Sequence, residues 1–150
     1  MSFAESSLFT NLYNKKLVAV RTILFPNGAA EVNGETLLNM CLSKFKCLRV
    51  LELRGATFET LSRNIGKLKH LRYLEISQNL NIKKLPESIC NLQSLLILKL
   101  DGCTELEALP IGLRKLISLR HLEFSTKQFI LPDNEIASLE LLANLSIISS

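Results

Sequence analysis

The sequence predicts an α/β solenoid, in which a curved parallel sheet lines the concave side and short helices or turns form the convex side. Hydrophobic residues, mostly Leu and Ile, make up 47% of the 150 residues, whereas aromatic residues make up only 6%. An apolar pattern with strand spacing recurs along the chain, and a second apolar segment with helical spacing follows each copy. A repeated unit explains these observations, because one unit cannot bury its apolar face alone but stacked units can.

Copies of the pattern L-x-x-L-x-L define the repeat, and their starting positions are spaced by 23, 24, 24 and 23 residues. The copies are Leu48/Leu51/Leu53, Leu71/Leu74/Ile76, Leu95/Leu98/Leu100, Leu119/Leu122/Phe124 and Leu142/Leu145/Ile147. Repeats of about 20–29 residues with this pattern are typical of a leucine-rich-repeat solenoid. The last two apolar residues of each copy lie two apart, so on a strand they point to the same side. We therefore expect successive strands to pair in parallel over a shared core.

The second half of each repeat predicts a short helix. Pro86, Pro110 and Pro132 each begin such a segment, and proline suits the first turn of a helix because its missing N–H would be unpaired there. The apolar residues that follow are three apart, as on one face of a helix. In the first repeat Ser62 stands in place of the proline, and we expect a less regular convex side there.

Each repeat also has a turn position three residues after its last strand hydrophobe. Successive repeats place Ala56, Asn79, Cys103 and Lys127 at this position. A small polar group suits it, because such a group can bond backbone left unpaired at a turn. Lys127 fits poorly, so we expect the fourth repeat to be looser there.

The pattern extends upstream of the first full copy. Val20, Ile23 and Phe25 repeat the strand spacing, and residues 35–45 have apolar positions at helical spacing. We therefore expect a leucine-rich-repeat domain over residues 20–150, with its last repeat truncated, after a weakly structured or helical segment at residues 1–19. Because solenoids normally need polar caps, the missing last cap predicts a fragment or a truncated gene product.

The sequence offers no residue set for catalysis, a cofactor or a metal. Its six glycines are scattered singly, so it contains no phosphate-binding loop. The four cysteines have no Cys-x-x-Cys spacing, and the two histidines lie in different repeats. We predict that the chain is not an enzyme and has neither a cofactor nor a metal site.

Targeting signals are absent from the sequence as well. The first ten residues lack the basic and apolar regions of a signal peptide. No apolar run approaches the ~18 residues that a membrane span requires. Four cysteines fit the cytosol as reduced thiols. We therefore expect a cytoplasmic protein without a membrane span.

Residues between the strand hydrophobes predict a protein-binding face on the concave side. Its three columns are Val50, Tyr73, Ile97 and His121; Glu52, Glu75, Lys99 and Glu123; and Arg54, Ser77, Asp101 and Ser125. Tyr73 is the best single anchor, because aromatic residues are enriched among interface hot spots. The second column can also form a charge ladder across strands, worth about 0.2–1 kcal/mol per pair. The two interpretations are compatible.

Charge is distributed unevenly along the chain. Residues 44–84 hold ten basic and three acidic residues, whereas residues 85–150 hold five basic and eight acidic ones. The early repeats thus offer a basic surface to an acidic partner, with Lys67, Lys69, Arg72, Lys83 and Lys84 as the candidate docking patch. Ordinary surface charge is the alternative. Nucleic acid is disfavoured, because only Tyr73 offers an exposed stacking ring within this stretch.

Several strings resemble plant intracellular immune receptors of the coiled-coil, nucleotide-binding, leucine-rich-repeat class. They are Val20-Arg21-Thr22-Ile23-Leu24, Leu48-Arg49-Val50-Leu51-Glu52-Leu53, Ile65-Gly66-Lys67-Leu68-Lys69-His70-Leu71-Arg72-Tyr73-Leu74, Lys84-Leu85-Pro86-Glu87-Ser88-Ile89 and Leu98-Lys99-Leu100-Asp101-Gly102-Cys103. Their order matches the opening of that family's repeat domain, and the resemblance covers about residues 18–145. No nucleotide-binding motif or coiled coil accompanies them in this sequence.

The resemblance implies a role in plant defence, in which the repeats recognise a pathogen effector or a guarded host protein. It also implies docking onto the receptor's own nucleotide-binding module, which the repeats hold in its resting state. A free-standing intracellular adaptor or scaffold of the Ras-pathway type, which shares the Leu-Pro-x-x-Ile motif, is the alternative function. An RNA-binding surface on residues 44–84 is a third, and the enzyme class has the least support.

Overall fold

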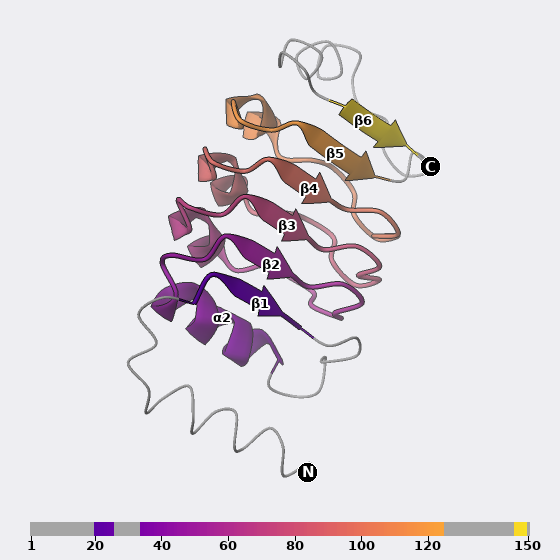
Figure 1. The fold of residues 1–150 in the computed structure, drawn as a ribbon. Coiled ribbons are helices and arrows are strands. Elements are labelled where there is room, and N and C mark those ends of the chain that lie inside the picture. Colours follow the sequence, from indigo (N-terminus) through magenta and orange to yellow (C-terminus); the bar gives the residue numbers. More distant parts are fainter. Residues whose placement is uncertain (1–19, 26–33, 125–145, 150) are drawn as a thin grey trace.

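A computed structural model describes residues 20–25, 34–124 and 146–149 of the chain (Figure 1). The chain coils into successive turns, and each turn adds one strand to a single parallel sheet with the strand order β1-β2-β3-β4-β5-β6. The strands are β1 (Thr22–Leu24), β2 (Val50–Glu52), β3 (Tyr73–Glu75), β4 (Ile97–Lys99), β5 (His121–Phe124) and β6 (Ser146–Ser149). The predicted α/β solenoid is confirmed.

Strand register follows the repeat spacing without a slip. Leu51 pairs with Leu74, Leu74 with Leu98, and Leu98 with Leu122, and each is the second residue of its strand. All four leucine side chains are fully buried. The upstream copy is confirmed too, because β1 pairs with β2 in the register that Ile23 and Leu51 predict. Equal spacing in sequence therefore becomes one column of leucine through the core.

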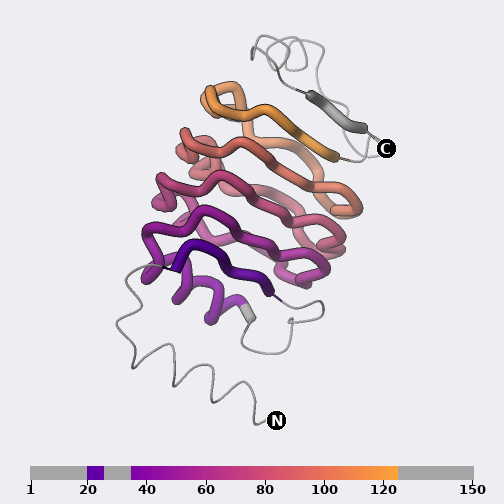
Figure 2. Tube along the Cα trace, viewed as in Figure 1, coloured from indigo at the N-terminus to yellow at the C-terminus, as the bar shows by residue number. Residues whose placement is uncertain are grey.

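Short helices cover the convex side of the solenoid, behind the sheet in the view of Figure 2. They are the α-helix α2 (Gly34–Lys44) and the 3-10 helices η1 (Arg63–Lys67), η2 (Glu87–Asn91) and η3 (Ile111–Lys115). The helix expected at residues 35–45 is confirmed within one residue at each end, and its seam of Leu38, Cys41 and Leu42 is buried. The N-terminal segment 1–19 lies outside the described residues.

The expectation of an irregular convex side in the first repeat is wrong. The helix η1 has the same length as η2 and η3, and the Ser62 hydroxyl replaces the proline as its cap by accepting from the Asn64 amide at 3.3 Å. The placement of the prolines differs from the prediction by one residue, since Pro86 and Pro110 precede the first helical residue. Proline's fixed φ suits this extended entry as well.

The turn position behaves as the sequence predicts. Ala56, Asn79 and Cys103 are all buried. The Asn79 side-chain oxygen accepts from the amides of Asn81 and Ile82, at 3.1 and 3.2 Å. The Cys103 thiol donates to the carbonyl of Ile76 in the preceding repeat, at 3.2 Å. Both side chains therefore satisfy backbone that the turn leaves unpaired. Lys127 lies outside the described residues.

Adjacent 3-10 helices approach closely where one of them has a glycine. A Cβ placed on Gly66 would lie 2.4 Å from the Ser88 carbonyl oxygen, and one on Gly112 would lie 3.2 Å from the Cys90 sulfur. The Glu87 carboxylate of η2 reaches the start of η3, where it accepts from the amides of Ile111 and Gly112 at 3.1 and 3.4 Å. The convex side is thus held by contacts between neighbouring repeats.

Candidate protein-binding surface

The first predicted column is aligned by the sheet itself. Val50, Tyr73, Ile97 and His121 occupy paired positions at the starts of β2 to β5. The first three are half-buried and His121 is exposed, while the leucine that follows each of them is buried. A strand alternates its side chains between faces, so these residues all point away from the core. They form an apolar and aromatic stripe across the strands.

The second column is charged and lies beside the first. Glu52, Glu75, Lys99 and Glu123 are half-buried and paired in register. Lys99 Nζ lies 3.1 Å from a carboxylate oxygen of Glu123, which is one rung of the expected charge ladder. Glu75 takes a different partner, because it accepts a hydrogen bond from the Tyr73 hydroxyl. Burial, the bond to Glu75 and nearby carboxylates raise the pKa of Tyr73 well above its usual value. Tyr73 therefore stays a neutral donor.

The third predicted column needs a correction. Arg54 is exposed and Asp101 is half-buried, but Ser77 is buried, so its side chain is no part of the surface. The physical reason is that the strands have ended by this point and the chain turns, with Gln78 at a φ of 59°. Gln78 is exposed instead and accepts from Arg54 Nε at 3.2 Å. Ser125 lies outside the described residues.

A row of arginines borders the apolar stripe on its other side, and sequence reasoning missed it. The row is aligned by backbone hydrogen bonds between neighbouring repeats. The amide of Arg49 donates to the carbonyl oxygen of Arg21, and the same bond recurs from Arg72 to Arg49, from Leu96 to Arg72 and from Arg120 to Leu96. All five side chains are exposed. The signal was available, since each residue follows the first leucine of its repeat copy or, for Arg21, directly precedes β1. The strand pattern does not include this position, because it lies one residue before each strand begins.

The structure divides the predicted basic patch into two parts. Lys67, Lys69 and Arg72 lie in η1 and in the turn that leads into β3, whereas Lys83 and Lys84 lie in the segment that returns from β3 to η2. All five are exposed. Lys69 Nζ donates to the Asn91 carbonyl at 3.0 Å, and Lys84 Nζ lies 3.4 Å from Glu107. The patch is therefore two basic areas on different edges of a repeat.

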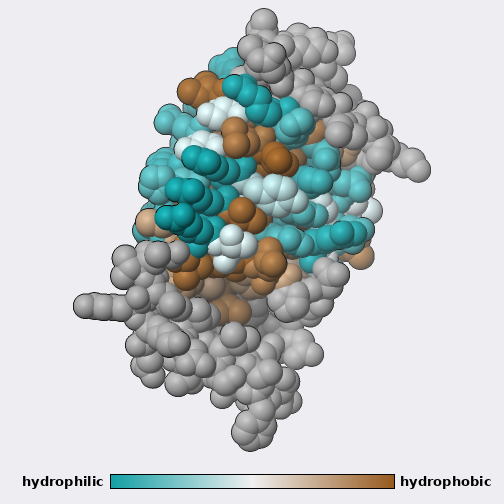
Figure 3. Space-filling view, in the orientation of Figure 1, coloured by the Kyte–Doolittle hydropathy of each residue, from teal (hydrophilic) through white to brown (hydrophobic). Residues whose placement is uncertain are grey.

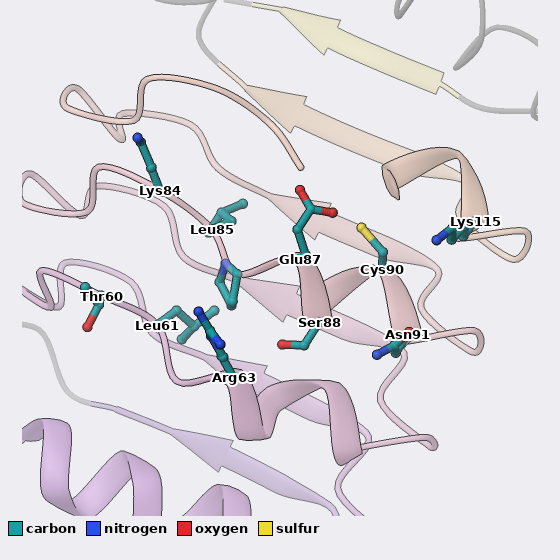
Figure 4. A pocket seen from close by; sticks show the side chains of 11 residues that line it. Thr60, Leu61, Arg63, Lys84, Leu85, Glu87, Ser88, Cys90, Asn91 and Lys115 are labelled. Carbon is teal, nitrogen blue, oxygen red and sulfur yellow. The ribbon is translucent and has the colours of Figure 1, made fainter. Parts of the chain in front are cut away.

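A shallow groove lies on the convex side, between the 3-10 helices (Figure 4). The charged ends of Arg63, Lys84 and Lys115 stand at its rim, and Glu87 points toward η3, whose amides it binds. Cys90 in this groove is buried. Burial raises the pKa values of Cys41, Cys90 and Cys103 to about 11 each, which disfavours the reactive thiolate. The groove thus lacks an activated nucleophile among the described residues.

In the described part of the chain, no group of three or more His, Cys, Asp or Glu side chains is arranged to hold a metal ion. None of the helices in residues 34–124 is long and apolar enough to cross a membrane.

These features define a repeat protein, and the chain belongs to the leucine-rich repeat family. The sequence pattern described as "Leucine-rich repeat region" matches residues 19–150. An internalin of Listeria monocytogenes has the same fold, with a TM-score of 0.54 at 19% identity over 73% of this chain and 30% of the internalin. Leucine-rich repeats are protein-interaction modules.

Within the family, the chain is similar to plant disease resistance proteins. One from Arabidopsis thaliana is 34% identical over 150 residues, which is 95% of this chain and 16% of that protein. Disease resistance protein RPP8 of Arabidopsis thaliana is 32% identical over 85% of this chain and 14% of its own length. TMV resistance protein N of Nicotiana glutinosa is 32% identical over 61% of this chain and 8% of its own length. The chain thus spans a small part of these relatives.

Proposed function

We propose that this chain is the recognition module of a plant immune receptor, and that its concave face binds a pathogen effector or a guarded host protein. The main observation in support of this proposal is the contrast between the two faces of the sheet. The paired inward position of β2 to β5 is leucine in every strand, whereas the outward positions on either side of it are apolar, aromatic, acidic and basic. Leucine satisfies the core, so the varied outward set is available for recognition, and similarity to resistance proteins supports a partner from plant defence.

Site-specific cross-linking tests this proposal. A photoreactive amino acid replaces Tyr73 in the full chain expressed in plant cells, and a matched variant carries it at Lys115 on the convex side. The expected result is a protein cross-linked at position 73 and not at position 115. That protein, once identified and purified, should bind the chain directly and lose at least about tenfold in affinity to Tyr73→Ala. Equal cross-linking at both positions would reject the concave face as the recognition surface.

A second role concerns the receptor's own nucleotide-binding module, which lies outside this chain. We propose that Lys67, Lys69 and Arg72 dock an acidic face of that module and help to hold it at rest. All three are exposed and follow one another into β3. Lys83 and Lys84 lie on another edge of the repeat, so we assign them to the control. The triple variant K67E/K69E/R72E should weaken binding to an isolated module of this receptor class, whereas K83E/K84E should not. Unchanged binding by the triple variant would remove this role.

A further inference from the structure

The concave face has three parallel stripes of different character. The arginine row defined above forms the first stripe, one residue before each strand, and Leu96 is its only uncharged member among the described residues. The apolar column of Val50, Tyr73 and Ile97 forms the second, and the column containing Glu52, Glu75 and Glu123 forms the third. Figure 3 looks onto this side of the strands and shows an apolar band bordered by hydrophilic side chains on both sides. The face is therefore basic, apolar and acidic in turn along β2 and β3, and β5 has the basic and acidic ends on either side of His121. The order is interrupted in β4, which has Leu96 and Lys99 at these ends, and in β1, which has Leu24 in the register of Glu52.

The width of this pattern fits one kind of structural element. Arg49 and Glu52 are three residues apart, which corresponds to about 10 Å along an extended chain. An α-helix with its side chains is about 10–12 Å in diameter. Neighbouring strands are about 4.8 Å apart, and residues three or four apart on a helix are about 5–6 Å apart. A helix lying across the strands can thus meet each repeat with one residue on each flank.

We propose that the concave face binds a partner α-helix that lies across strands β1 to β5, with an acidic flank on the arginine row, an apolar seam on Val50, Tyr73 and Ile97, and a basic flank on the glutamate column. The proposal rests on the concave recognition function above and specifies the chemistry of the partner. Because the two flanks carry opposite charge, the helix binds in one direction only. Five strands span about 19 Å, which a helix of about 13 residues covers.

Internal contacts on the face are compatible with this partner. Lys99 already neutralises the charge of Glu123. The Tyr73 hydroxyl that donates to Glu75 is neutral and leaves the charge of Glu75 in place, so the acidic stripe is strongest at Glu52 and Glu75. The arginine row has its break at Leu96, next to the apolar column. A matching helix therefore carries an apolar residue on its acidic flank opposite Leu96. This detail separates the proposal from attraction between net charges alone.

The test uses two synthetic helical peptides of about 18 residues with identical composition. The segregated peptide has a Leu seam with Glu on one flank and Lys on the other, while the mixed peptide distributes Glu and Lys over both flanks. Fluorescence anisotropy measures the binding of each to the full chain at low and at high salt. The segregated peptide should bind at least about tenfold more tightly. Equal binding of both peptides would overturn the proposal, because general electrostatics would then suffice.

Charge-reversal variants locate the stripes. R49E/R72E should weaken the segregated peptide at least about tenfold. The matched control K83E/K84E makes the same change of net charge on another edge and should bind almost as the unmodified chain does. Equal weakening by both variants would also overturn the proposal.

The exchange variant R49E/R72E/E52K/E75K inverts the stripes and tests direction. It should bind the segregated peptide again, with the helix turned end for end. Cys47 is exposed while Cys41, Cys90 and Cys103 are buried, so a dye on Cys47 and a second on the peptide N-terminus report this reversal by energy transfer. Failure to recover binding, or recovery without a change in energy transfer, would reject the segregated helix as the ligand. A partner that cross-links at Tyr73 through a loop or strand would reject the helix and leave the recognition function intact.

Discussion

The strand side and the helix side of this solenoid solve the same stacking problem in different ways. On the strand side one residue type repeats, so that Leu51, Leu74, Leu98 and Leu122 form a single buried column. On the helix side each junction is different. Ser62 caps η1 from within its own repeat, Glu87 caps η3 from the repeat before it, and glycine occurs in one of the two helices at each close contact.

This difference shows where stacking depends on periodicity and where it depends on individual pairs. A parallel sheet holds its neighbours at a constant spacing, so the same side chain fits every layer. Five-residue 3-10 helices have no ladder of backbone hydrogen bonds between them, and the distance between neighbouring helices is set by the side chains that meet. We expect changes on the strand side to act through lost burial, and changes on the helix side to act through a named partner.

The largest loss of stability is expected for Leu74→Ala. Leu74 is fully buried at the centre of the sheet, so truncation should lower the free energy of unfolding by about 2–5 kcal/mol, from lost burial and the cavity that remains. Urea denaturation measures this quantity. Leu80→Ala is the matched control, because Leu80 is 55% exposed and should lose far less. Similar losses for the two variants would contradict the core column.

Gly66→Ala is the next largest change and acts on the helix side. The new Cβ would lie 2.4 Å from the Ser88 carbonyl oxygen, which is backbone and must move. We expect a loss of about 1–3 kcal/mol in the free energy of unfolding. Gly112→Ala should cost less, because its nearest neighbour is the Cys90 sulfur at 3.2 Å. Cys90→Ala removes the sulfur but keeps the Cβ at 3.3 Å, so it should relieve part of the Gly112→Ala cost and leave the Gly66→Ala cost unchanged. Additivity in the first pair would refute the assigned contact.

Sequence reasoning predicted the paired strand positions residue by residue, but it missed the arginine row that precedes the strands and predicted the helix side only in outline. The register of Val50, Tyr73, Ile97 and His121 followed from spacing, because a sheet converts equal spacing into alignment. The loss of Ser77 from the surface did not, since alternation ends where the strand ends. The Glu87 cap was also beyond the sequence, because it depends on how far one helix lies from the next. These contacts are set by packing between repeats, which a single-repeat pattern does not contain.

A smaller loss is expected from the cap that links η2 to η3. Glu87→Ala removes the acceptor for the amides of Ile111 and Gly112 and the negative charge at the start of η3. The free energy of unfolding should fall by about 1 kcal/mol, as for loss of a helix cap. Glu105→Ala makes the same change of charge at an exposed position between β4 and η3 and should be nearly neutral. Amide hydrogen exchange of Ile111 and Gly112 should rise in the first variant alone. Unchanged exchange there would refute the cap.

Gln78 offers the smallest change and the only expected gain. Its φ is 59°, in the left-handed region, where the equivalent turns of the neighbouring repeats have Gly55 and Gly102. An L side chain costs about 1–2 kcal/mol in this region, while glycine adds about 0.5–1 kcal/mol of unfolded-state entropy. Gln78→Gly also loses the exposed bond from Arg54, so a net gain of about 0.5 kcal/mol is expected in urea denaturation. Gln78→Ala loses the same bond and keeps the strain, so the difference between the two variants isolates the backbone. If the alanine variant is instead more stable than the glycine variant by the about 0.5–1 kcal/mol of entropy, the turn is not strained, and Gln78 is retained there for its contact with Arg54.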